Sequence, residues 1–106
     1  MYIVVFITAS NKKEAQAIAR SLIAHKLAAC VNIIDKVASL FWWQGKVDSA
    51  SEALLIVKSK KEKFRRIVTL VKSLHSYEVP EIIALPILMG EKKYLRWIDE
   101  SLGKPA

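Results

Sequence analysis

Residues 75–81 hold the densest group of side chains that could do chemistry. The segment reads His-Ser-Tyr-Glu-Val-Pro-Glu and lies between a predicted helix and a predicted strand. Connecting segments commonly carry binding residues because a rigid scaffold positions them. We therefore expect the candidate site here. The competing interpretation is a turn in which Tyr77 and Glu78 satisfy backbone groups and Pro80 fixes the entry to the strand.

Cys30, His75 and Glu78 are the side chains that suit a metal ion, since sulfur, imidazole and carboxylate ligands bind copper or zinc. Their spacing specifies no site within one chain, although symmetry in an oligomer could bring copies of them together. The single Cys excludes zinc sites built from several cysteines. The alternatives are a buried structural Cys30 and a solvated His75, and we expect His25 to be structural.

The sequence carries no pattern typical of an enzyme. Neither the Cys nor the two His residues lie in a recognisable nucleophile motif. The three Gly residues are far apart, so a Gly-rich phosphate loop is absent, and residues 9–11 supply no Arg for a phosphate loop after the first strand. We therefore expect no catalytic residues and no enzymatic activity.

Length and composition indicate one folded domain over residues 1–106. Hydrophobic residues make up 53% and charged residues 25% of the chain, which is enough to bury a core. The lone Cys cannot form an intrachain disulfide, no apolar run approaches about 18 residues, and no leader precedes residues 2–7. These features predict a cytoplasmic protein without a membrane partner. The low count of Asn and Gln, four in total, is a bias of thermostable proteins.

The net charge of +7 would suit an anionic partner. The densest positive cluster lies at residues 58–66 and comprises Lys58, Lys60, Lys61, Lys63, Arg65 and Arg66. This cluster lacks the interleaved aromatic residues that stack on bases. We therefore expect a solvated helix face and no nucleic acid partner.

The first half of the chain predicts a strand and a helix. Residues 2–8 form a nearly unbroken apolar run, which predicts a strand covered on both faces or placed centrally in a sheet. Asn11 and Glu14 have the spacing of a capping box. The apolar stripe that follows predicts a helix ending near Leu27.

The middle of the chain predicts a hairpin and a second helix. Two extended stretches, residues 30–43 and 46–58, flank a Gln44-Gly45 turn. Ser59 and Glu62 repeat the capping-box spacing. The buried stripe of the helix that they would open is Phe64, Ile67, Val68, Val71 and Leu74.

The last part predicts a strand at residues 82–88 and a short helix after Gly90. Pro86 within that strand indicates an edge position or a bulge, because proline cannot donate to the ladder. The full order is the split βαβ arrangement of an α+β, ferredoxin-like βαββαβ fold with a C-terminal helix.

The predicted hairpin is too long for one subunit to cover. The fourteen residues from 30 to 43, if extended, reach roughly 46 Å, whereas a 100-residue domain has a radius of gyration near ~13 Å. Large apolar side chains occupy both faces of its tip: Leu40, Phe41, Trp42 and Trp43. Leaving each of these side chains in water loses about 1.5–3 kcal/mol of burial free energy. We therefore predict a homo-oligomer that buries them. The alternative is a bulge near Asp35-Lys36 that folds the strand back over its own core.

Four segments resemble the CutA family of divalent-cation tolerance proteins. They are residues 27–33 (LAACVNI), 41–46 (FWWQGK), 75–81 (HSYEVPE, with Pro86 beyond) and 94–97 (YLRW). They lie in the family's order and span nearly the whole chain. The resemblance implies a compact homotrimer, related in architecture to PII signalling proteins, in which the long hairpins join the subunits. It also implies a non-enzymatic role in the response to divalent metals, particularly copper.

The same resemblance implies site residues. The family's suspected copper contacts fall on Cys30 and His75, with Cu(II) or another divalent ion as the candidate ligand. The residues that would line a cleft between subunits are Trp43, Tyr77, Glu78 and Trp97. The alternative function is a PII-like signalling protein that senses a small anion or a nucleotide in such clefts, which the positive net charge favours.

Overall fold

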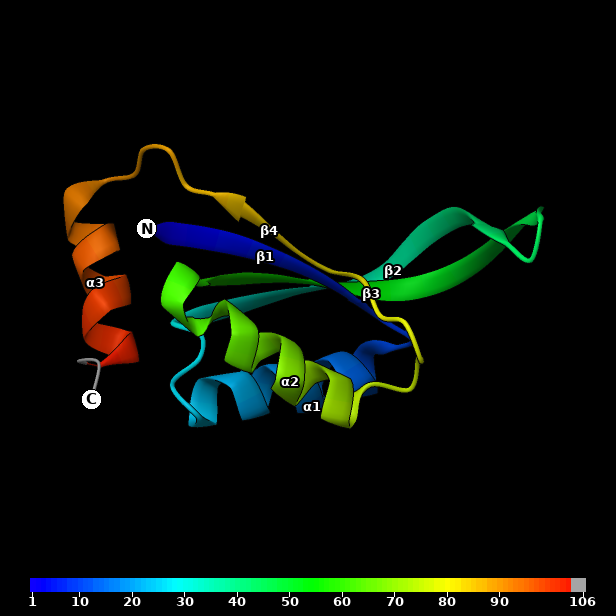
Figure 1. Ribbon diagram of the computed structural model, residues 1–106, viewed down its shortest axis with the longest axis horizontal. Coiled ribbons are helices and arrows are strands. Elements are labelled where there is room, and N and C mark those ends of the chain that lie inside the picture. Colours follow the sequence, from blue (N-terminus) through cyan, green and yellow to red (C-terminus); the bar gives the residue numbers. More distant parts are fainter. Residues whose placement is uncertain (104–106) are drawn as a thin grey trace.

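The computed structural model describes residues 1–103, which form an antiparallel four-stranded sheet with two helices packed against one face (Figure 1). The strands run in the order β2-β3-β1-β4. The elements are β1 (Tyr2–Ala9), α1 (Lys12–Ala24), β2 (Cys30–Trp43), β3 (Lys46–Lys60), η1 (Lys61–Lys63), α2 (Phe64–Leu74), β4 (Ile82–Pro86) and α3 (Lys92–Leu102). The expected ferredoxin-like fold with a C-terminal helix is confirmed.

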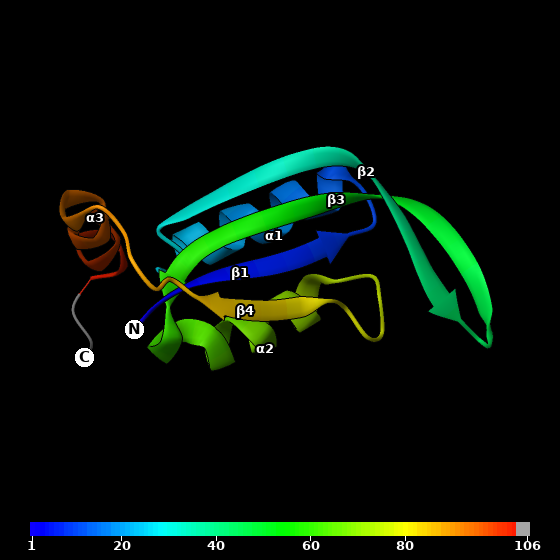
Figure 2. The same ribbon diagram turned by 90° about the horizontal axis from the view of Figure 1, so that it is seen from above.

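Strand β1 lies in the middle of the sheet and pairs with both β3 and β4. Every second residue of β1 is buried against the helices, while its other residues are only partly covered. The core lies between the sheet and the two helices (Figure 2). Its main members are Ile3, Val5, Ile7, Ala15, Ile18, Leu22, Leu55, Val57, Ile67 and Val71.

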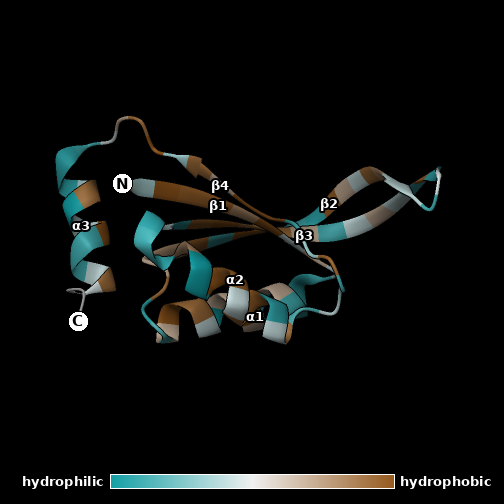
Figure 3. Cartoon of the chain, in the orientation of Figure 1, coloured by the Kyte–Doolittle hydropathy of each residue, from teal (hydrophilic) through white to brown (hydrophobic). Residues whose placement is uncertain are grey.

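Strands β1 and β4 are apolar along most of their length (Figure 3), so the sheet face turned away from α1 and α2 also carries apolar residues. Residues paired across neighbouring strands point to the same face, so Phe6 lies beside Ile56 and Ile83. We call this surface the open sheet face, formed by Val4, Phe6, Ile34, Leu54, Ile56, Ile83 and Leu85. The predicted central position of β1 is confirmed, but in a single chain helices cover only one of its faces.

Strands β2 and β3 continue beyond the body of the molecule as a projecting hairpin (Figure 1). Gln44 and Gly45 have φ angles of 49° and 79°, the two consecutive positive values that a two-residue type I′ turn requires. A bulge lies between Ile34 and Val37, the place that the alternative to the projecting hairpin gave it. It does not fold the hairpin back over the core, because Trp42 and Trp43 remain 75% and 60% exposed.

The predicted capping box at Ser59 and Glu62 is wrong. Ser59 pairs with Ile3 as part of β3, and its buried hydroxyl donates to the Leu27 carbonyl at 2.6 Å. Glu62 lies in the 3-10 turn η1, where its carboxylate is 3.7 Å from the amino group of Met1. Because pairing with β1 extends β3 to Lys60, the helix starts later than predicted.

Two element ends also differ from the prediction. Helix α1 ends at Ala24 rather than near Leu27, since the chain turns through a positive φ of 59° at Lys26 and buries Leu27 in the core. Strand β4 ends at Pro86 rather than Leu88. It is an edge strand, as Pro86 indicated.

Helix α3 is anchored at one end of the sheet by a polar cluster of Tyr2, Lys60 and Asp99. The Tyr2 hydroxyl donates to Asp99 Oδ2 at 2.5 Å, and Lys60 Nζ lies 2.8 Å from Asp99 Oδ1. Hydrogen bonds from Lys60 and then Tyr2 hold the pKa of Asp99 below its usual value. The same bonds to Asp99 raise the pKa of Tyr2 and of Lys60.

We expect Asp99→Asn to loosen α3 in a pH-dependent way. Because the pKa of Asp99 is lowered by folding, its charge stabilises the protein above the ordinary value of about 3.9, and this contribution is lost as the pH falls through the folded value. The effect should be small, since the ion pair is partly exposed. Urea midpoints of parent and variant should differ at pH 7 and converge at about pH 2.

Glu100→Gln, on the same helix, is the matched control, and it should leave the midpoint unchanged at both pH values. A difference between parent and Asp99→Asn that persists at low pH would show that charge does not anchor α3.

Candidate functional site

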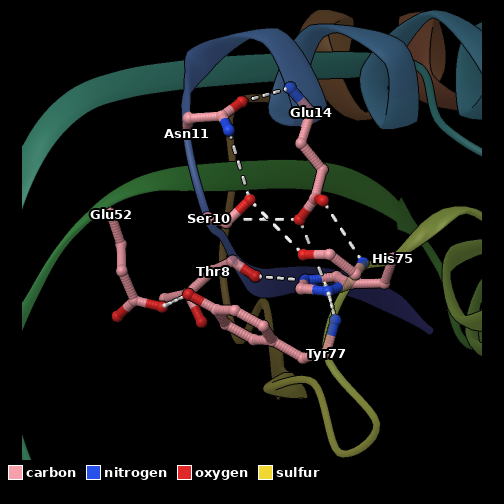
Figure 4. A network of polar contacts seen from close by, with 8 residues as sticks. Thr8, Ser10, Asn11, Glu14, Glu52, His75 and Tyr77 are labelled. Carbon is pink, nitrogen blue, oxygen red and sulfur yellow. Dashed lines mark hydrogen bonds and ion pairs between the residues drawn. The ribbon is translucent and has the colours of Figure 1, made fainter.

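His75 directly follows α2, and its side chain is fully buried. The amide of Tyr77 donates to Nδ1 at 3.0 Å, which places the ring proton on Nε2. Nε2 then donates to the Thr8 carbonyl at 2.6 Å (Figure 4). Nε2 therefore holds the loop after α2 against β1, while Nδ1 bonds within the loop, and in this arrangement neither nitrogen offers a lone pair to a metal ion.

Glu14 joins the first turn of α1 to the same loop (Figure 4). Its carboxylate accepts from the Ser10 amide at 3.1 Å and from the Ser76 amide at 3.2 Å. The Asn11 cap is confirmed, since the Glu14 amide donates to the Asn11 side chain at 2.8 Å. Burial alone would raise the pKa of Glu14, but the hydrogen bonds from Ser76 and Ser10 outweigh it and lower the pKa.

Tyr77 ties this loop to the base of the hairpin. Its hydroxyl donates to Glu52 Oε2 at 2.9 Å, and Glu52 is only 8% exposed. Glu52 pairs with Val37, the residue at which regular pairing resumes after the bulge. Burial raises the pKa of Tyr77 to about 12, and the hydrogen bond and charge of Glu52 add to the effect. The pair fixes the loop against the bend of the hairpin.

Cys30 lies at the far end of the sheet, where β2 begins. It is half-buried and pairs with Lys58, whose ammonium nitrogen is 4.0 Å from the sulfur. The same ammonium donates to the Asn32 side chain. Burial raises the pKa of Tyr94 on α3, and the adjacent Cys30 sulfur adds to the shift. The thiol is thus surrounded by Lys58, Asn32 and Tyr94.

The structure does not bring Cys30 and His75 together within one chain. His75 contacts Thr8, which pairs with Leu54, whereas Cys30 pairs with Lys58 farther along β3. Leu54 and Lys58 are four residues, or roughly 13 Å, apart along β3. Their shared role as metal ligands stays a prediction, and it requires residues of different subunits.

The predicted cleft residues are also spread over one chain. Trp43 ends β2 at the hairpin tip, whereas Trp97 lies on α3 at the other end of a molecule 44 Å long (Figure 1). Tyr77 and Glu78 lie in the loop between these ends. Within residues 1–103, no group of three His, Cys, Asp or Glu side chains could hold a metal ion. A crevice lined by these residues requires more than one copy of the chain.

Several participants in the polar network were not predicted as site residues, among them Thr8, Glu14 and Glu52. Glu14 was assigned only a capping role, although its carboxylate reaches the loop 62 residues away. Thr8 contributes a carbonyl, which its side chain cannot reveal. For Glu52 there was a signal, because a carboxylate directly precedes the apolar run of residues 53–57.

With this geometry in hand, comparison with known proteins decides the family. A family model described as CutA1 divalent ion tolerance protein matches residues 3–101. This chain belongs to that family.

The CutA1 chain is similar to proteins from several kinds of organism. It is 47% identical over 102 residues to the divalent-cation tolerance protein CutA of Archaeoglobus fulgidus, covering 96% of this chain and 99% of the relative. The solved divalent cation tolerance protein of Thermus thermophilus has a TM-score of 0.95 at 45% identity, with 97% of this chain and 100% of that chain covered. A chloroplastic CutA 1 of Oryza sativa is 46% identical over 99 residues, which are 93% of this chain and only 56% of that relative.

The family model and the names of these relatives confirm the resemblance seen in the sequence, and the names of the Archaeoglobus and Thermus proteins concern tolerance of divalent cations. The solved protein of Archaeoglobus fulgidus is described as periplasmic and the rice relative as chloroplastic, so the named compartments differ. In the described part of this CutA1 chain, no helix is both long and apolar enough to cross a membrane.

We expect Tyr77→Phe to lower the free energy of unfolding by about 1–3 kcal/mol, because it leaves the buried Glu52 carboxylate without its donor. Urea unfolding at one fixed protein concentration measures the loss. Removing both partners in Tyr77→Phe/Glu52→Leu should recover most of it, since no buried polar group is then unpaired. Losses that simply add in the double-mutant cycle would contradict this coupling.

Proposed function

We propose that this CutA1 chain acts as a non-enzymatic homotrimer in the cellular response to divalent cations, and that copper(II) binds in a crevice between its subunits. The observation that carries the proposal is that a single chain leaves two large apolar surfaces exposed. One is the open sheet face and the other is the hairpin tip. The relatives' tolerance of divalent cations supports the metal response.

The exposed surfaces are too extensive for a stable monomer. Six of the exposed side chains are Ile34, Leu40, Trp42, Trp43, Ile83 and Leu85. Burying that many large side chains gives of order 10 kcal/mol, comparable with the whole stability of a domain. Contiguous exposed apolar surface of this kind marks an interface between proteins.

The two edges of the sheet support a closed ring of copies. Strands β2 and β4 form opposite edges, and each leaves backbone groups without a partner in this sheet. Pairing β2 of one copy with β4 of the next uses two different surfaces, which is a head-to-tail contact. A closed ring, such as a trimer, satisfies every edge without forming an open filament.

The shape of the chain supports a crevice between subunits. Trp43 at the hairpin tip and Trp97 on α3 are at opposite ends of one molecule. A tip that reaches the α3 end of another copy would bring these two side chains together. Cys30 lies at the α3 end of the molecule, beside Tyr94.

We expect the parent protein at micromolar concentration to have three times the 12.0 kDa mass of one chain, measured by light scattering after size-exclusion chromatography. Leu40→Ser/Trp42→Ser should lower the mass, because it removes two apolar contacts worth about 1.5–3 kcal/mol each. Leu74→Ser changes a comparably apolar, partly exposed residue on the helical side and should leave the mass unchanged. A parent protein of 12.0 kDa would refute the assembly.

We propose Cys30 as the sulfur ligand of the metal, in a reducing cytoplasm that keeps this lone thiol reduced. His75 is less available as a ligand than Cys30, since both of its ring nitrogens are hydrogen-bonded. It becomes a ligand only if the bond to Thr8 or Tyr77 opens. The metal site should therefore depend more strongly on Cys30 than on His75.

Anaerobic copper(II) titration by calorimetry tests this order. Cys30→Ser should weaken binding at least about tenfold, or ~1.4 kcal/mol, and His75→Gln should weaken it less. The control is His25→Gln, because His25 lies on the surface and its ring bonds to Ser21 of α1. Unchanged affinity in both Cys30→Ser and His75→Gln would remove these residues from the site.

A further inference from the structure

A groove of about 430 Å³ lies where the start of α2 meets β4. Its apolar lining is Met1, Ile3, Phe64, Ala84 and Pro86, and Leu85 of the open sheet face also borders it. The volume is within the roughly 300–1,000 Å³ range of sites that bind small molecules. Figure 2 shows α2 running beneath β4 on this side of the sheet, with the start of α2 and the end of β4 near the N-terminus of the chain. The groove is thus at the opposite end of α2 from His75 and is remote from the hairpin tip, and Cys30, although at the same end of the sheet, is not among its lining residues.

Two cations complete the lining of the groove: Lys61 and Arg65. They are four residues apart across η1 and the first turn of α2, so their side chains lie on the same side. Both are exposed, and neither makes an ion pair with any residue from 1 to 103. The nearby carboxylate of Glu62 forms ion pairs with the Met1 amino group and with Lys60, each at 3.7 Å.

We propose that this groove binds a small carboxylate with an apolar body, of the kind represented by medium-chain fatty acids. The apolar lining accepts the body, and Lys61 and Arg65 hold the carboxylate. A guanidinium matches a carboxylate with two parallel hydrogen bonds, which favours this anion over a neutral head group. The proposal does not rest on the metal response, since it uses none of the residues assigned to that role.

The test uses octanoate as the probe and the full chain in its native assembly. Amide chemical shifts followed by two-dimensional NMR should move for residues 61–65 and 84–86 during the titration. Octanol supplies the apolar body without the charge, and acetate supplies the charge without the body. Both should bind at least about tenfold more weakly than octanoate, or ~1.4 kcal/mol.

Two matched pairs of variants locate the site. Lys61→Gln/Arg65→Gln should weaken octanoate at least about tenfold. Arg66→Gln/Lys72→Gln removes the same charge from α2 outside the groove, and should change the affinity less than twofold. Ala84→Asp places a negative charge in the lining and should also weaken octanoate at least about tenfold, whereas the neutral Ala84→Asn of similar size should not.

Three results would overturn the proposal. The first is equal affinity for octanoate in the two charge-removal variants, which would make the attraction non-specific. The second is equal binding of octanol or acetate, which would show that either the cations or the apolar lining contributes nothing to the affinity. The third is no shift at residues 61–65 in the parent, which would mean that the assembly or the chain itself closes the groove. None of these results bears on the copper titration.

Discussion

The four-stranded sheet has helices packed on only one of its faces, and this constraint governs the rest of the molecule. Helices α1 and α2 supply the apolar stripes that complete one core. The open sheet face has equally apolar residues, such as Phe6 and Ile83, with no such cover from α1 or α2. Exposing that apolar surface to water is unfavourable, and this is the physical basis for the proposal that other copies of the chain cover it.

Sequence periodicity predicted the order of the elements because each helix and strand carries its own apolar repeat. It predicted the projecting hairpin because chain length and side-chain size set the reach of the ribbon. It failed at Ser59, where the local spacing was that of a helix cap. The hydroxyl instead bonds to the Leu27 carbonyl, 32 residues away. A contact so distant in sequence leaves no local signature, and strand pairing overrode the capping preference.

The candidate segment takes part in a network of polar contacts whose partners the sequence did not specify, and the metal-binding role of its residues stays a prediction. His75 has the chemistry of a ligand, yet it bonds to the backbone at Thr8 and Tyr77. Which role a histidine takes depends on what surrounds it, and that is decided by tertiary packing. Glu14 and Glu52 were missed for the same reason, since their partners, Ser76 and Tyr77, lie on another element.

The hydrogen bond between Tyr77 and Glu52 attaches the base of the hairpin to the body of the molecule. Glu52 sits beside the bulge, and the whole projecting arm extends beyond it. A small rotation at this attachment point would displace the tip by a much larger distance. The position of the loop of residues 75–81 therefore affects the positions of Trp42 and Trp43. The Tyr77 hydroxyl is thus bonded at the point where the farthest part of the chain leaves the body of the molecule.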